Sequence, residues 1–282
     1  MSEELYHPPE SVSSIAYISS MEQYREMYER SINSPDEFWA EQAEQFCWFK
    51  KWNQVRSFNY DIAKGNINIE WFKGGECNIT SNCLDRHLKE RGDQVAILWE
   101  GNEPGENKEI TYKELHKEVC KFANVLKSHG VKKGDRVSIY MPMIVELAIA
   151  MLACARLGAV HSIVFGGFSP TALADRIVDS GCTILITTDG GFRGAKSIPI
   201  KVNADDAIAL AENQGVQINT CIIAQRVGDA IPVNMHKGRD FWWHEEMANA
   251  SSVCEPEIME SEDPLFTLYT SGSTGKPKGV QH

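Results

Sequence analysis

Regular alternation of strand and helix patterns runs through most of this 282-residue chain and constrains its fold more than any other feature. Short aliphatic runs typical of buried strands are followed by longer stretches with helical periodicity. The predicted strands are residues 95–99, 136–140, 160–165, 183–187 and 218–224, and the helices begin near residues 111, 142, 169 and 203. Because parallel strands need crossovers of about this length, the pattern predicts an α/β fold: a mainly parallel sheet with helices on both faces and right-handed crossovers.

Local signals fix several helix ends. Thr111 and Glu114 have the spacing of a capping box. Ser169 before Pro170 is typical of an N-cap followed by proline at the first helical position. Gly158 is expected to stop the apolar helix before it.

Residues 1–90 lack this alternation and are predicted to wrap around an α/β domain formed by residues 91–282. Pro35, with acidic residues after it, predicts a helix that runs to about Trp52. A second helix is expected to start near Asn82, and residues 228–263 are predicted to be irregular. The helix after Pro35 carries six aromatic side chains, for which packing is the favoured interpretation: Phe38, Trp39, Phe46, Trp48, Phe49 and Trp52.

The last fifteen residues place an apolar strand before a loop of threonine, serine, glycine and lysine. Glycines permit tight turns, hydroxyls and backbone N–H groups donate hydrogen bonds, and Lys276 adds a positive charge, so the loop is predicted to hold phosphate oxygens. It is not a Walker P-loop, because only two residues separate Gly272 from Gly275 and Pro277 follows the lysine. A strand–loop–strand arrangement is therefore expected, with a flexible Gly/Ser linker as the alternative.

Two more glycine-rich loops follow predicted strands, where ligands gather in parallel sheets. Residues 165–169 lead into a helix whose N-terminus favours an anion. Residues 188–196 contain Arg193 and Lys196, which suit a phosphorylated ligand. Taken alone, each loop is better explained by an ordinary turn or a solvated surface loop.

Composition narrows the range of partners. The chain is 43% hydrophobic and 24% charged, with a net charge of −11, which argues against a nucleic-acid or anionic-membrane surface. The eight cysteines form no Cys-x-x-Cys pair, the N-terminus lacks a signal-peptide pattern, and no apolar run is long enough to span a bilayer. A cytoplasmic location with buried free thiols is predicted. His161 is expected to be a core histidine with its hydrogen bonds satisfied, and no catalytic nucleophile–base pair or metal cluster is recognised.

The terminal motif Tyr-Thr-Ser-Gly-Ser-Thr-Gly-Lys-Pro-Lys-Gly resembles the phosphate loop of the adenylate-forming superfamily. Residues 71–87 and 262–266 resemble the acetyl-CoA synthetase family within it, and the resemblance runs almost from end to end. It implies that the loop from residue 270 binds the β- and γ-phosphates of ATP through Thr270, Ser271, Gly272, Ser273, Thr274, Gly275 and Lys276. It also implies a site for the CoA nucleotide made by Phe165, Gly166, Gly167, Arg193, Gly194, Ala195 and Lys196. Ala195 departs from the family pattern, where glycine is common.

The resemblance further implies an acetate–CoA ligase that forms acetyl-CoA, AMP and pyrophosphate from acetate, ATP and CoA through an acetyl-adenylate, with Mg²⁺ ligands beyond residue 282. The chain is then expected to be an N-terminal fragment, cut just after the phosphate loop and inactive alone. Three alternatives remain open. They are a propionate or other short-chain acyl-CoA synthetase, a non-catalytic nucleotide- or CoA-binding module, and a Walker-type NTPase, which the Gly272–Gly275 spacing and Pro277 disfavour.

Overall fold

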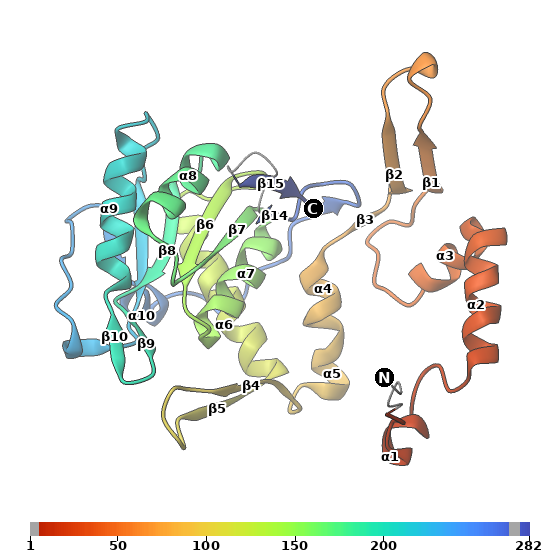
Figure 1. Ribbon diagram of the computed structural model, residues 1–282, viewed down its shortest axis with the longest axis horizontal. Helices are drawn as coiled ribbons and strands as arrows, with labels where there is room; N and C mark the ends of the chain where they lie inside the picture. The colour runs from red at the N-terminus through yellow and green to blue at the C-terminus, as the bar shows by residue number, and fades with distance from the viewer. Residues whose placement is uncertain (1–5, 271–276) are drawn as a thin grey trace, which may run out of the picture.

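The computed structural model describes residues 6–270 and 277–282, and its largest element is a seven-stranded sheet (Figure 1). The strand order is β12-β11-β8-β6-β7-β14-β15, and all neighbouring pairs are parallel except β14 and β15. In that order the strands are Asp240–Trp242, Thr220–Ala224, Ile184–Thr188, Arg136–Met141, Val160–Phe165, Phe266–Thr270 and Lys278–Gln281. The predicted mainly parallel sheet is confirmed.

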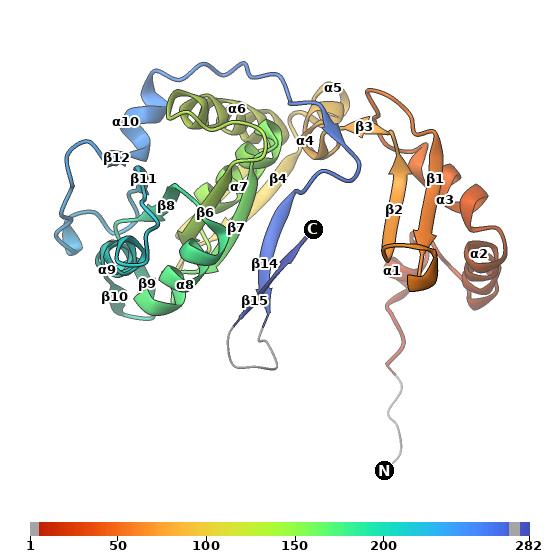
Figure 2. The same cartoon turned by 90° about the horizontal axis from the view of Figure 1, so that it is seen from above.

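Helices cover both faces of this sheet, as predicted (Figure 2). One face packs against α6 (Tyr112–Ser128), α7 (Val145–Leu157) and α10 (Trp243–Ala248), and the other against α8 (Pro170–Ser180) and α9 (Ile200–Glu212). Strand β6 contributes to both cores, because Ile139 lies in the first apolar cluster and Tyr140 in the second. The sheet is therefore buried on both sides, which explains its continuous aliphatic runs.

The chain reverses direction across the sheet at β7. Helix α7 joins β6 to β7 on one face, whereas α8 and α9 carry the chain back to β8 and β11 on the other. Such a reversal opens a crevice at the carboxyl ends of the strands.

The predicted helix ends form. Thr111 and Glu114 make both hydrogen bonds of a capping box. The Ser169 hydroxyl accepts from the Ala172 backbone N–H, and Gly158 ends α7 in the left-handed conformation. These local signals worked because each stabilises a backbone group that the helix leaves unpaired.

Two of the antiparallel pairs outside the main sheet are hairpins of the α/β part. The strand predicted at residues 95–99 forms β4 (Val95–Glu100), but it pairs with β5 (Asn107–Thr111) and not with the main sheet. The correction follows from the connection, since the few residues between them can join only antiparallel strands. The glycine-rich loop at residues 188–196 contains a second hairpin, β9 (Gly191–Arg193) and β10 (Lys196–Ile198).

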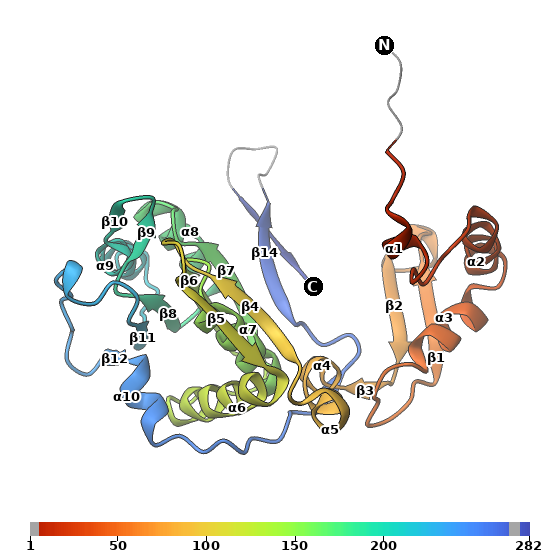
Figure 3. The same ribbon diagram turned by 90° about the horizontal axis from the view of Figure 1, so that it is seen from below.

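The N-terminal elements lie beside the α/β part and join it through β3 and α4 (Figure 3). They are α1 (Glu10–Ser13), α2 (Met21–Asn33), α3 (Pro35–Ala43), β1 (Gln54–Asn59), η1 (Ile62–Lys64), β2 (Asn68–Lys73), β3 (Glu76–Cys77), α4 (Ile79–Cys83), η2 (Asp85–His87) and α5 (Leu88–Arg91). Strands β1 and β2 form an antiparallel pair, and β3 pairs with β13 (Met259–Glu260).

The helix predicted from Pro35 to about Trp52 was too long, because α3 ends at Ala43. Beyond it, the Phe49 and Lys50 backbone N–H groups donate to the Glu76 carbonyl, so this stretch bonds to β3 instead of continuing the helix. Trp48 and Trp52 do pack, as expected, with ring centroids 5.0–5.5 Å from each other and from Phe72, whereas Phe46 and Phe49 are about half exposed.

Two further boundaries differ from the predictions. The helix expected near Asn82 starts at Ile79, because the Asn78 side chain caps it by accepting from the Thr80 backbone N–H. Residues 228–263 are not wholly irregular, since they contain η3 (Gly228–Ala230), β12, α10 and β13. Strand β12 has only three residues and begins with an aspartate, so its sequence carried little strand signal.

A buried arginine ties the N-terminal elements to the α/β part. Arg156 of α7 is only 2% exposed, and its guanidinium donates to both oxygens of Asp85, at 2.8 and 2.9 Å. It also donates to the Cys254 carbonyl and to the Thr80 hydroxyl. The His116 Nε2 atom lies 3.4 Å from the same carboxylate. Four separate segments therefore meet around the carboxylate of Asp85.

The imidazole of His116 gives this network a pH dependence. Its hydrogen bonds to Asp85 and then to Cys120 raise the pKa of His116 to about 9. Because the pKa of an unfolded histidine is about 6.5, this stabilisation is complete below pH 6.5 and is lost as the pH rises through 9. We expect the free energy of unfolding in urea to fall by at most about 3 kcal/mol from pH 6.5 to 9.5, and His116→Gln to flatten this slope. An equal slope in the variant would contradict the assignment.

His161 lies in the core, as predicted, but its hydrogen bonds are not all satisfied. It is 5% exposed, and Nδ1 has no hydrogen-bond partner within residues 6–270 and 277–282. Burial lowers the pKa of its imidazole to about 4, so the ring is neutral at pH 7.

All eight cysteines are free, and five are buried. None of the described helices combines the length and apolarity that crossing a membrane would require.

Candidate functional site

A cavity of about 480 Å³ opens at the carboxyl edge of the main sheet, where the chain reversal predicts a crevice. Its floor comes from residues that follow β6, β7, β8 and β11, and its outer wall from the β4–β5 hairpin. The lining residues are Trp99, Glu100, Gly101, Asn102, Pro142, Met143, Ile144, Phe165, Gly166, Gly167, Gly191, Phe192, Arg193, Ile198, Ile200, Asn203 and Arg226. The cavity thus brings together Phe165, Gly166, Gly167 and Arg193, which belong to two of the loops that the sequence singled out.

The first of these loops leaves β7 and enters α8. A side chain at Gly166 would meet the backbone of Met141 and Pro142 at 3.0 Å, so glycine lets β7 end close against β6. The Tyr140 hydroxyl donates to the Phe168 carbonyl at 2.7 Å. Packing alone therefore favours glycine at position 166, and the loop is held in place next to the cavity.

The second loop presents a free cation. Arg193 lies at the end of β9, is exposed, and has no ion-pair or hydrogen-bond partner in the part of the chain that the structure describes. Gly194, Ala195 and Lys196 form the exposed tip and return of the hairpin but do not line the cavity. Gly194 has a φ of +58°, whereas Ala195 does not adopt a positive φ. The methyl group of Ala195 therefore causes no backbone strain.

One buried carboxylate holds two rims of the cavity together. Asp189 is 1% exposed and follows β8. Its oxygens accept from the backbone N–H groups of Gly190, Arg226, Val227 and Gly228, at 2.7–3.1 Å. The turn after β8 and the turn after β11 are thereby fixed to the same side chain.

The outer wall of the cavity was missed by sequence reasoning. Trp99 and Asn102 of the β4–β5 hairpin and Arg226 after β11 all line it. The Trp99 indole donates to the Met143 carbonyl, and the Asn102 amide donates to the Gly194 carbonyl. No short motif marks these residues, because they come together only through the tertiary placement of the β4–β5 hairpin beside the sheet.

A strand lies on each side of the predicted phosphate loop, as expected. Strand β14 ends at Thr270 and pairs antiparallel with β15, which begins at Lys278. A strand, and not a helix, therefore follows the glycine-rich segment, which removes the geometric basis of the Walker alternative. The other site residues predicted here, Ser271, Gly272, Ser273, Thr274, Gly275 and Lys276, lie outside the described residues.

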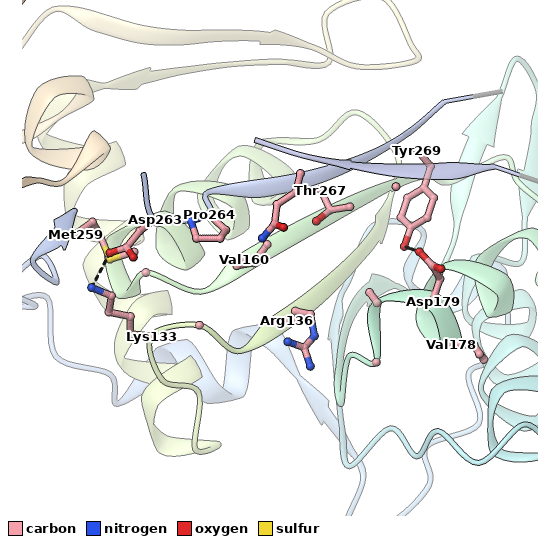
Figure 4. A pocket seen from close by; sticks show the side chains of 16 residues that line it. Lys133, Arg136, Val160, Val178, Asp179, Met259, Asp263, Pro264, Thr267 and Tyr269 are labelled. Atoms are coloured by element: carbon pink, nitrogen blue, oxygen red, sulfur yellow. Dashed lines mark hydrogen bonds and ion pairs between the residues drawn. The ribbon is translucent and has the colours of Figure 1, made fainter. Parts of the chain in front are cut away.

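A larger hollow, of about 660 Å³, lies at the opposite, amino ends of β6 and β7. Figure 4 shows that four of its polar groups pair with each other: Lys133 with Asp263 at 2.7 Å, and the Tyr269 hydroxyl with Asp179 at 2.7 Å. None of the residues that the sequence predicted for ligand binding lines it. Its size therefore does not make it the candidate site.

One group of side chains within the described residues has metal-like spacing: Asp205, His236 and Asp240. The buried Lys201 ammonium pairs with both carboxylates at 2.7 and 2.8 Å, and Arg239 bonds to both as well. Because two cations already neutralise the two acids, the cluster is balanced without a metal ion.

Comparison with known proteins identifies the class to which this fold and site belong. A family model described as AMP-binding enzyme matches residues 84–282, and one described as the acetyl-coenzyme A synthetase N-terminus matches residues 24–83. The chain therefore belongs to the AMP-binding enzyme family.

Its relatives include several proteins named acetyl-coenzyme A synthetase. That of Magnetococcus marinus is 58% identical over 262 residues, which cover 93% of this chain and 39% of the relative. That of Desulfatibacillum aliphaticivorans is 53% identical over all 282 residues and 42% of its own length. That of Saccharophagus degradans is 56% identical over 279 residues, which cover 99% of this chain and 42% of the relative. The chain thus spans about two fifths of the length of these relatives.

Proposed function

We propose that this chain supplies the CoA-nucleotide site and the ATP-phosphate loop of an acetate–CoA ligase. The observation that carries the proposal is the cavity at the carboxyl edge of the sheet, which brings two glycine-rich loops and a free arginine together. The names of the relatives, which share 51–58% identity with the chain, support acetate as the acyl substrate. The proposed reaction converts acetate, ATP and CoA to acetyl-CoA, AMP and pyrophosphate.

In this proposal, residues 1–90 form the wrapping segment and residues 91–282 belong to the AMP-binding domain. Phe165, Gly166 and Gly167 provide an apolar surface and a close backbone for the adenine of CoA. Arg193, with Gly194, Ala195 and Lys196 on the same hairpin, faces the phosphate groups of the nucleotide. The segment from Thr270 to Lys276 holds the outer phosphates of Mg²⁺-bound ATP.

The chemistry divides into two balanced steps. An acetate oxygen attacks the α-phosphorus of ATP, and the bond to pyrophosphate breaks, giving acetyl-AMP. The CoA sulfur then attacks the acetyl carbonyl, AMP leaves with the bonding electrons, and the thiol proton is released. Such steps depend mainly on positioning and on neutralising phosphate charge. The lysine of the phosphate loop is suited to neutralising charge on ATP, and Arg193 to positioning CoA.

Acetate-dependent exchange of ATP with labelled pyrophosphate tests the reaction. We would measure it in a chimera that carries this chain in place of the matching part of the Desulfatibacillum relative. The expected result is exchange with acetate that exceeds exchange with propionate. The 282-residue chain alone is expected to bind CoA but to support no exchange. A chimera that folds, binds CoA and remains inactive with every short carboxylate would favour a non-catalytic binding module.

Arg193→Ala in the 282-residue chain tests the CoA assignment directly. CoA carries a 3′-phosphate that dephospho-CoA lacks, and a charge-assisted bond to phosphate is worth about 1.5–3 kcal/mol. We expect Arg193→Ala to weaken CoA binding about ten- to hundredfold and to leave dephospho-CoA binding nearly unchanged. Isothermal titration calorimetry measures both constants.

A matched control for this experiment is Lys237→Ala, which removes an exposed positive charge that does not line the cavity. Equal losses for both ligands in the Arg193 variant would exclude a 3′-phosphate contact. Losses in the Lys237 variant would point to a nonspecific charge effect.

A further inference from the structure

Arg226 has an arrangement that neither of the predicted loops explains. Its guanidinium makes two hydrogen bonds to Glu106, at 2.5 and 2.9 Å. It also lies over the rings of Trp99 and Phe192, 5.3 and 4.9 Å from their centroids. A guanidinium is flat and can pair with a carboxylate at its edge while its faces contact aromatic rings.

The four side chains of this cluster come from three separate segments. Trp99 and Glu106 belong to the β4–β5 hairpin, Phe192 to β9, and Arg226 to the turn after β11. Asp189 holds that turn through its hydrogen bond to the Arg226 backbone N–H at 2.7 Å. Arg226 therefore connects both hairpins to a turn that is itself fixed to the main sheet. Figure 1 shows the two hairpins at the same end of that sheet.

The charge of Arg226 is already balanced, unlike that of Arg193. The hydrogen bond from Arg226 is the main cause that lowers the pKa of Glu106 to about 2, so the carboxylate is ionised at neutral pH. Arg193 is exposed without a partner among the described residues. The two arginines of the cavity are thus suited to different tasks: Arg193 to bind a phosphate, and Arg226 to hold the walls.

We propose that Arg226 and Glu106 are positioning residues that set the width of the cavity for the planar base of an adenine nucleotide. They clamp the β4–β5 hairpin against the β9–β10 hairpin and do not contact the phosphates of the ligand. The inference rests on the proposed CoA site and names the residues that shape it. The wall that they hold, Trp99 to Asn102, lines the same cavity as the Phe165–Gly167 loop.

The test compares CoA with dephospho-CoA in the 282-residue chain and its variants Arg226→Lys and Glu106→Gln. Each variant breaks the two-bond pair while leaving Arg193 in place. Losing one charge-assisted pair corresponds to about a tenfold change in a binding constant. We expect each variant to weaken both ligands by about this factor, so that the ratio of the two dissociation constants stays at the unsubstituted value. The double variant is expected to be no weaker than either single one, because both remove the same contact.

Arg56→Lys is the matched control, because Arg56 pairs with Asp36 at 2.6 Å and lies over Phe58 at 5.5 Å, in the N-terminal elements. It is expected to leave both constants unchanged, and thermal unfolding checks that each variant is folded. A selective loss of CoA binding in Arg226→Lys would make Arg226 a direct phosphate ligand and overturn the proposal. Unchanged binding in Arg226→Lys and Glu106→Gln would overturn it too. If the unsubstituted chain binds neither CoA nor dephospho-CoA, the proposed function is wrong, and so is the proposed role of Arg226 and Glu106.

Discussion

Replacing Arg156 with methionine is expected to lower the free energy of unfolding of this chain by about 3–5 kcal/mol. Methionine fills a similar length but removes every donor that the buried guanidinium offers to Asp85, Thr80 and the Cys254 carbonyl. The largest cost comes from Asp85, whose partly buried carboxylate would lose both guanidinium hydrogen bonds and keep only the His116 imidazole as a cationic partner. Urea denaturation monitored by circular dichroism measures the change, which would consume a large fraction of the stability of an ordinary domain.

A second substitution distinguishes the contribution of the Arg156–Asp85 ion pair from that of side-chain packing. Asp85→Leu in the Arg156→Met background removes the abandoned charge, so the double variant is expected to regain most of the loss. Arg136→Met is the control, since Arg136 is exposed and forms no ion pair with any described residue. A loss below about 1 kcal/mol in Arg156→Met would show that the four segments are held by apolar packing alone.

Lys276→Ala is expected to lower acetate-dependent ATP–pyrophosphate exchange in the chimera by about a hundred- to a thousandfold. A group that neutralises charge as it develops in a transition state typically contributes this much. The prediction rests on the sequence of the loop and on the strands β14 and β15 that flank it. Binding of CoA, which we assign to the cavity at the carboxyl edge, is expected to be unchanged.

Lys278→Ala provides the comparison for this substitution. Lys278 begins β15 two residues further on, pairs with Thr270 across the hairpin, and is exposed. Removing it takes one charge from the same segment, so exchange is expected to fall by less than about threefold. If Lys276→Ala retained at least half of the exchange activity, the assignment of the loop to ATP phosphates would be wrong.

The fold was predictable where local preference and tertiary packing agree. The aliphatic runs of β6, β7, β8 and β11 are buried on both faces, so their composition alone indicated a parallel sheet. The prediction failed where distant contacts decide the structure. The stretch after Ala43 has helical composition, yet its backbone bonds to Glu76, and no local pattern reports that partner.

The candidate site divides in the same way. Phe165, Gly166 and Arg193 were predicted as site residues because glycine-rich turns after strands can be recognised in a sequence. The resemblance to a known family then indicated CoA as their ligand. Asp189 and Arg226 were not singled out, since a carboxylate that accepts four backbone N–H groups and an arginine between two rings look like ordinary loop residues until the chain is folded. Whether the two loops bind CoA remains a proposal.

The carboxylate of Asp189 has one more consequence. Because Asp189 joins the turn after β8 to the turn after β11, a shift of one turn is expected to move the other with it. A substitution that moves one turn would then be tolerated only if the backbone N–H groups of the other turn can still reach Asp189. The pair should evolve as a unit, even though more than thirty residues separate them in the chain.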